Sequence, residues 1–102
     1  MPRIKLILAY DGTDFHGWQF QNPAHRTVQA ELERAVAKIV GHRAPVQGAG
    51  RTDSGVHALG QVAHFDCPEA LAGVPWRVAL NALLDHDVRV VEASHAAPDF
   101  HA

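Results

Sequence analysis

The sequence predicts an α+β domain with the order strand, helix, strand, strand, helix, strand. Three features predict it: alternating apolar residues near the N-terminus, two segments with apolar residues every three or four positions, and glycine-rich turns between the elements. Elements in this order form a ferredoxin-like βαββαβ unit, a four-stranded antiparallel sheet with both helices on one face. The 102 residues suit one compact domain spanning 1–102, with the other face of the sheet open to a partner or a substrate.

The first element is a strand from Arg3 to Tyr10, because every second residue from Ile4 onward is apolar and faces the same side. The segment from Asp11 to Arg26 is rich in turn formers and reads as a long loop. A loop of this length in so small a domain is more often functional than idle.

A helix follows, capped by Thr27 and ended by Gly41. Its apolar face consists of Val28, Leu32, Ala35, Val36, Ile39 and Val40. The chain then predicts a short strand from Ala44 to Ala49, a loop from Gly50 to Gly55, and a strand within Val56 to Phe65. A second helix starts at Pro75, and Val88 to Ala93 form the last strand. The second helix is expected to turn inward Trp76, Ala79, Leu80, Leu83 and Leu84.

Composition narrows the function classes. With 47% hydrophobic and 20% charged residues, the chain is an ordinary globular protein, and it has no apolar run long enough to span a bilayer. We therefore expect a cytoplasmic protein with no membrane partner. The net charge of −2 argues mildly against a nucleic-acid partner, although a basic patch or a further part of the protein could offset it.

Neither cysteine nor histidine chemistry is indicated. Cys67 is the single cysteine, has no positive neighbour in sequence, and is expected to be small and partly buried rather than nucleophilic. The eight histidines lack the spacing of metal ligands, so we expect no metal.

The stretch "GAGRTDSG", from Gly48 to Gly55, matches neither a dinucleotide fingerprint nor a phosphate-binding loop nor a nucleophile elbow. If the segment is extended, Arg51 and Asp53 lie on one side and can pair, which keeps the carboxylate ionised and oriented as a nucleophile or base. The alternative is a hairpin tip in which Asp53 bonds to its own backbone. The chemistry alone favours the hairpin.

The stretch "YDGTDFHGWQFQ", from Tyr10 to Gln21, combines aromatic, amide and glycine residues in a loop. Such a mixture could stack on RNA bases or grip an RNA backbone. Phe15 and Trp18 could equally fold back to close the edge of the core. Composition does not separate these two interpretations.

Together these stretches resemble a known family. "GRTDSGVHALGQVAHF" is similar to the catalytic motif of tRNA pseudouridine synthases of the TruA type, and "YDGTDFHGWQFQ" to their first conserved loop. "TVQAELERAV" resembles their first helix, and "LNALLDHDVRVVEA" with "PDFHA" the end of their N-terminal half. The resemblance covers nearly the whole chain in the family's order and favours the catalytic interpretation of Asp53.

The resemblance implies an enzyme that isomerises uridine to pseudouridine at positions 38–40 of the tRNA anticodon stem-loop, without a cofactor. Asp53 matches the essential aspartate, which either attacks C1′ or removes a proton from C2′, and Arg51 matches the arginine that orients it. The first conserved loop implies RNA contacts at Asp11, Gly12, Thr13, Gly17, Trp18 and Gln19.

The resemblance also implies an active site between two ferredoxin-like domains, in a homodimer that binds one tRNA across both subunits. The second half would supply a tyrosine and apolar residues to the site, so the 102 residues alone are expected to be inactive. Two alternatives are a non-catalytic RNA-binding module, which lacks support because "GQVAHFD" has no basic-aromatic signature, and a purely structural or regulatory domain.

Overall fold

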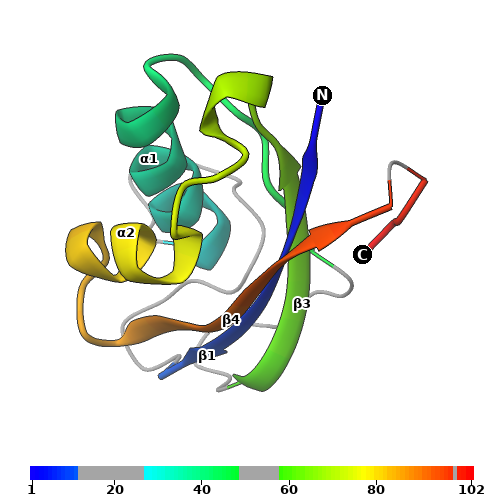
Figure 1. The fold of residues 1–102 in the computed structure, drawn as a ribbon. Helices are drawn as coiled ribbons and strands as arrows, with labels where there is room; N and C mark the ends of the chain where they lie inside the picture. Colours follow the sequence, from blue (N-terminus) through cyan, green and yellow to red (C-terminus); the bar gives the residue numbers. More distant parts are fainter. Residues whose placement is uncertain (12–26, 49–57, 98) are drawn as a thin grey trace.

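The computed structural model describes residues 1–11, 27–48, 58–97 and 99–102. One antiparallel sheet has the order β2-β3-β1-β4. Its strands are β1 (Arg3–Tyr10), β2 (Gln47–Gly48), β3 (Ala58–Asp66) and β4 (Val88–Ala96). Both helices, α1 (Val28–Val40) and α2 (Trp76–Leu83), cover one face of the sheet (Figure 1). This confirms the predicted α+β fold and is consistent with a ferredoxin-like arrangement; one unpredicted 3₁₀ turn, η2 (Glu69–Leu71), precedes α2.

The central strand β1 pairs along its whole length with both β3 and β4. Its residues alternate between buried and half-buried, and the four buried ones expose 5% of their surface or less. These four are Ile4, Leu6, Leu8 and Tyr10, as the alternation predicted. The buried side chains face the helices, so the core lies between the sheet and the helix layer.

The predicted signals at both ends of α1 are confirmed. The Thr27 hydroxyl accepts a hydrogen bond from the Ala30 N–H at 3.3 Å. Gly41 adopts a left-handed φ of 87° and donates its N–H to the Ala37 carbonyl at 2.8 Å, which suits glycine because it has no Cβ.

The second helix begins at Trp76, one residue after the predicted start, and two residues expected to face inward are not buried: Ala79 is half-buried and Leu83 is exposed. Trp76, Leu80 and Leu84 are buried, as expected, but Leu83 is 36% exposed. The helix ends at Leu83, and Leu84 leaves it in an extended conformation. Leu84 therefore takes the inward place after Leu80, and Leu83 turns toward solvent.

Strand β2 has two residues, whereas the sequence predicted a strand from Ala44 to Ala49. Pro45 has no N–H to donate to a ladder. The next residue, Val46, donates its N–H to the Glu33 carboxylate at 3.0 Å, and its carbonyl accepts a hydrogen bond from the Gln29 side-chain amide at 2.9 Å. Because α1 binds these backbone groups, pairing with β3 begins only at Gln47.

The opposite edge of the sheet is tied to α2 in the same way. The Asn81 amide group donates to the Val90 carbonyl at 3.0 Å and accepts from the Val90 N–H at 2.8 Å. The strand β4 continues to Ala96, three residues beyond the predicted end, because it pairs with β1 as far as Arg3. Similarly, β3 extends one residue past the prediction, to Asp66.

Candidate functional site

The predicted catalytic pair, Arg51 and Asp53, lies outside the described residues, within 49–57. The described chain fixes the two residues on either side of this segment. Gly48 ends β2 opposite Ala63, and Ala58 begins β3 opposite Tyr10 of β1. The segment therefore connects the edge strand β2 to the beginning of the inner strand β3.

Most of the predicted RNA-contact residues also lie outside the described residues, within 12–26: Gly12, Thr13, Gly17, Trp18 and Gln19. The exception is Asp11, which is exposed and donates its backbone N–H to the Asp87 carbonyl at 2.9 Å. On the other side of the segment, Thr27 is completely buried at the start of α1.

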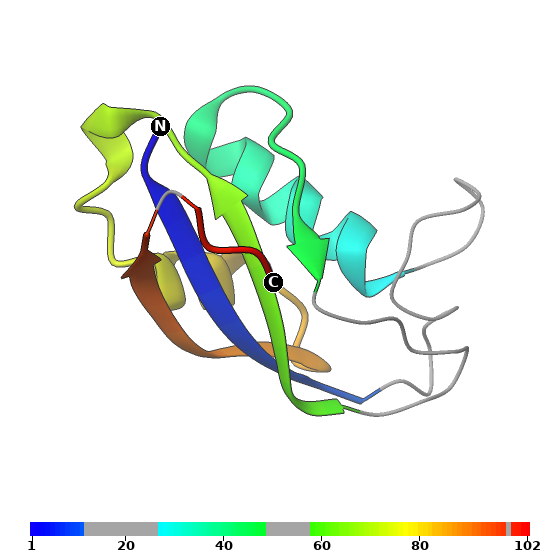
Figure 2. The same ribbon diagram turned by 90° about the vertical axis from the view of Figure 1, so that its right-hand side faces the viewer.

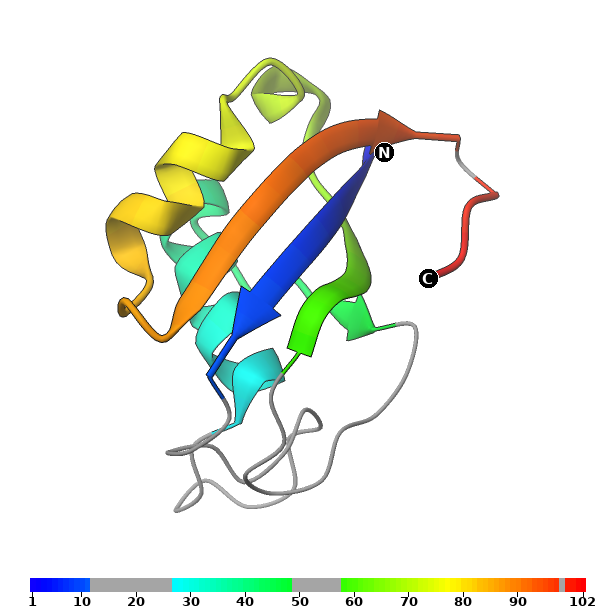
Figure 3. The same ribbon diagram turned by 90° about the horizontal axis from the view of Figure 1, so that it is seen from below.

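One bound of each segment lies at the same end of the sheet, which we call the Tyr10 end and define by Tyr10, Ala58 and Val88. Tyr10 pairs with Ala58 on one side and Val88 on the other. Figure 3 shows the end of β1, the beginning of β3 and the first turn of α1 at this same end of the molecule. Asp11 and Ala58, which each bound one of the two predicted functional segments, thus lie close in space, whereas Gly48 pairs with Ala63 further along the sheet, at the level of Leu6.

A glycine bulge shapes β3 just after the predicted catalytic segment. The register with β1 shifts between Leu8, opposite Gln61, and Ala9, opposite Leu59, so that Gly60 is the extra residue. Gly60 has a φ of 102°, which side chains rarely adopt. Our sequence reasoning missed this feature, although a lone glycine inside a strand pattern is its usual signal.

The opposite end of the sheet, which we call the Arg3 end, carries a polar cluster. The Arg3 guanidinium binds the Asp66 carboxylate with two bonds, Nε to Oδ1 at 2.8 Å and Nη2 to Oδ2 at 3.2 Å. The hydrogen bond from Arg3 lowers the pKa of Asp66. Arg3 Nη1 also donates to the Phe100 carbonyl, so one side chain joins the first strand, the third strand and the C-terminal residues.

His64 is the buried member of this cluster, 4% exposed. Its Nδ1 accepts a hydrogen bond from the Ala102 N–H at 3.1 Å. Its ring meets those of Phe100 and His101 edge-on, with centroid distances of 5.9 and 5.3 Å. Burial lowers the pKa of His64, and the nearby Arg3 and His101 lower it further. No sequence signal identified His64, because its hydrogen-bond partner Ala102 is 38 positions away.

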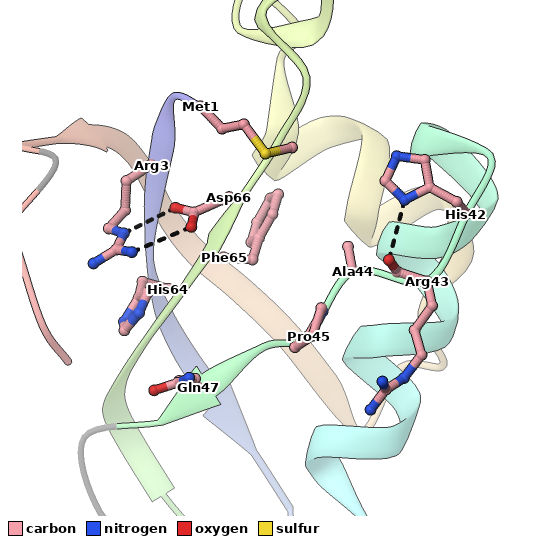
Figure 4. Close-up of a pocket in the computed structure, with 10 residues that line it drawn as sticks. All are labelled: Met1, Arg3, His42, Arg43, Ala44, Pro45, Gln47, His64, Phe65 and Asp66. Carbon is pink, nitrogen blue, oxygen red and sulfur yellow. Dashed lines mark hydrogen bonds and ion pairs between the residues drawn. The ribbon is translucent and has the colours of Figure 1, made fainter.

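A cavity of about 290 Å³ opens beside this cluster, where the 42–47 segment diverges from β3 (Figure 4). Phe65 and Pro45 contribute apolar surface to it, and Arg43 and Gln47 line it from the edge segment. The guanidinium of Arg3 is already bound to Asp66 at this cavity, so its charge is neutralised within the protein.

Two further expectations concern reactive and metal-binding side chains. Cys67 is completely buried, more than the partial burial predicted, and burial raises the pKa of its thiol. A protonated, inaccessible thiol is a poor nucleophile. Within the described ranges, no group of three or more His, Cys, Asp or Glu residues is arranged to hold a metal ion, and no helix is long and apolar enough to cross a membrane.

Comparison with known proteins gives a consistent result. A family model described as tRNA pseudouridine synthase matches residues 6–102. A protein of Maridesulfovibrio salexigens is 58% identical over 102 residues, one of Solidesulfovibrio magneticus 61% over 103, and one of Limosilactobacillus fermentum 56% over 105. Each is named tRNA pseudouridine synthase A, and each alignment covers all of this chain but only 37%, 38% and 40% of the relative, respectively.

Proposed function

The chain belongs to the tRNA pseudouridine synthase family, and on this premise we propose that it supplies the catalytic-motif part of an enzyme that isomerises uridine in tRNA. The substrate is a uridine at positions 38–40 of the anticodon stem-loop. The observation that carries the proposal is the motif "GRTDSGVHALGQVAHF". Its last part belongs to β3, an inner strand of the sheet that begins opposite Tyr10. The enzyme works in the cytoplasm as a homodimer, and these 102 residues form its N-terminal domain.

In this reaction the N1–C1′ glycosidic bond breaks, the uracil turns over, and C5 forms a new bond to C1′. The proton leaves C5 and a proton returns to N1, so the reaction needs no net oxidant or reductant. Asp53 either attacks C1′ or removes a proton from C2′ to form a glycal. The target uridine must leave its stack first, which costs on the order of a few kcal/mol.

Arg51 orients the Asp53 carboxylate and keeps it ionised, because an adjacent positive charge favours the charged form of the acid. The loop residues Gly12, Thr13, Gly17, Trp18 and Gln19, together with Asp11, contact the RNA. The pairing of Tyr10 with Ala58 supports this assignment, because the RNA-binding loop and the segment that carries the acid then each have one bound at the Tyr10 end. The rest of the enzyme completes the site, so the 102 residues alone are inactive.

The decisive test replaces Asp53 with asparagine in the intact gene at its native locus. We expect pseudouridine to disappear from positions 38–40 of cellular tRNA, as mapped by carbodiimide labelling and primer extension, because the amide can act neither as nucleophile nor as base. Ser54→Ala is the matched control one residue away and should leave the modification intact. If the signal persists in Asp53→Asn in the absence of a redundant synthase, Asp53 belongs to a hairpin turn and the protein is not this enzyme.

A further inference from the structure

The residues that follow β4 return over the open face of the sheet, opposite the helices. The Phe100 N–H bonds to the Ala97 carbonyl at 2.9 Å, which turns the chain back after the strand ends. Figure 2 shows residues 99–102 in front of the sheet, with the helices behind it. The open face is therefore partly covered at the Arg3 end by the chain itself.

Three side chains from two neighbouring strands hold this returning segment. Arg3 of β1 donates to the Phe100 carbonyl, and His64 of β3 accepts from the Ala102 N–H. Lys5 of β1 places its ammonium group 5.5 Å from the centre of the Phe100 ring. Lys5 and His64 are direct partners in the sheet register, so the segment is held over one cross-strand pair.

The clamp is itself held in place by neighbouring groups. Two bonds from Arg3 to Asp66, its partner in the register, fix the guanidinium plane and leave Nη1 to reach Phe100. His64 is buried, and a buried ring nitrogen without a partner would cost free energy, so the bond to Ala102 satisfies it. An acceptor at Nδ1 requires the tautomer that carries its proton on Nε2.

We propose that His64 is a positioning residue that, with Arg3, clamps Phe100–Ala102 to the open face and fixes the direction in which the chain continues to the rest of the enzyme. This inference rests on the proposed function, in which the active site lies between this domain and a second one. Two bonds two residues apart define a direction as well as a point, because a single bond would leave the segment free to rotate. The clamp would thereby set where the second domain stands relative to the Tyr10 end.

The test uses two substitutions in the full-length enzyme: one removes the hydrogen-bond acceptor of His64 and keeps a ring, and the other removes the ring and keeps an acceptor. His64→Phe keeps an aromatic ring against Phe100 and His101 but has no acceptor. His64→Asn loses the ring but places an oxygen near the position of Nδ1. Hydrogen exchange is measured by mass spectrometry on peptides covering residues 99–102. The exchange rate should rise about fivefold in His64→Phe, as expected for the loss of one hydrogen bond, and return toward the wild-type rate in His64→Asn.

His42→Phe is the control, because His42 lines the same cavity but is exposed, and its Nδ1 bonds to the carbonyl of its neighbour Arg43. It should leave the exchange unchanged. Equal exchange in wild type and His64→Phe, or an equal rise in both His64 variants, would overturn the acceptor role. If His64→Phe does not fold, selective ¹⁵N-histidine spectra of the wild type decide, since a proton on Nδ1 is incompatible with the clamp.

Pseudouridine formation is measured separately on the same proteins. A positioning role predicts a slower single-turnover rate in His64→Phe that His64→Asn restores. If exchange at residues 99–102 is slow but the enzyme forms no pseudouridine, the proposed function is rejected while the contact between His64 and Ala102 stands. Normal activity in His64→Phe, despite faster exchange, would reject the positioning role.

Discussion

The strand β1 is held in different ways at its two ends. At the Tyr10 end, the backbone makes pairings: Tyr10 with Ala58 and Val88, and the Asp11 N–H with the Asp87 carbonyl. At the Arg3 end, charged and polar side chains add to the pairing and also hold the C-terminal residues. The course of the C-terminal residues therefore depends on particular side chains at the Arg3 end.

The largest expected effect tests whether the stability of the Arg3 end comes mainly from the apolar core or from the polar cluster. Phe65 lies between His64 and Asp66 in sequence, but its side chain faces the helices and is 1% exposed. The centroid of its ring lies 4.9 Å from that of Trp76. We expect Phe65→Ala to lower the free energy of unfolding by about 3–5 kcal/mol, measured by urea denaturation. Phe65→Leu should cost less because it fills most of the space. A loss below about 1 kcal/mol in the alanine variant would contradict the assignment of Phe65 to the core.

An intermediate effect is expected at the Tyr10 end, where the backbone itself is unusual. A Cβ added to Gly60 would meet no atom within 4 Å, so Gly60→Ala tests the φ of 102° without a clash. We expect a loss of about 1–2 kcal/mol in the free energy of unfolding, the usual cost of forcing a left-handed conformation on an L-residue. The measurement is again urea denaturation.

Gly73 provides the matched control, because a Cβ there also meets nothing within 4 Å, and its φ lies outside the left-handed range. Gly73→Ala should be neutral or slightly stabilising, since it restricts the unfolded chain. Equal losses at both glycines would show that the bulge conformation carries no special cost.

Patterns local in sequence predicted the elements that local physics determines. The alternation along β1, the Thr27 cap and the Gly41 stop each depend on residues within a few positions of one another, and the structure confirms all three. The failures have non-local causes. The strand β2 is short because side chains of α1 bind the backbone of Val46, 13 and 17 positions away.

The same distinction between local and non-local causes applies to the candidate site residues. Arg51 and Asp53 are two residues apart in sequence, so a motif could name them as candidates. At the Arg3 end, Arg3 binds partners 63 and 97 positions away, and no window of sequence contains both. A motif can propose candidate site residues from sequence, and Arg51 and Asp53 remain predictions, whereas no sequence pattern could propose a cluster assembled by strand pairing.

The smallest expected effect is the pH dependence of stability at the Arg3 end. The pKa of His64 is lowered by burial, by the Arg3 guanidinium and by His101, while Asp66 opposes the shift. Since the unfolded chain then binds a proton more readily than the folded one, the contribution of neutral His64 is complete above about pH 6.5 and is lost as the pH falls toward the folded pKa.

The wild-type free energy of unfolding should therefore decline from pH 7.5 to 5.5 more steeply than that of His64→Phe, which has no group to titrate there. Urea denaturation across this range measures both slopes. Identical slopes in wild type and His64→Phe would mean that folding does not change the pKa of His64, so that the Ala102 bond does not stabilise its neutral form. The C-terminal residues would then be held by Arg3 and Lys5, and the contrast with the Tyr10 end would rest on these two side chains.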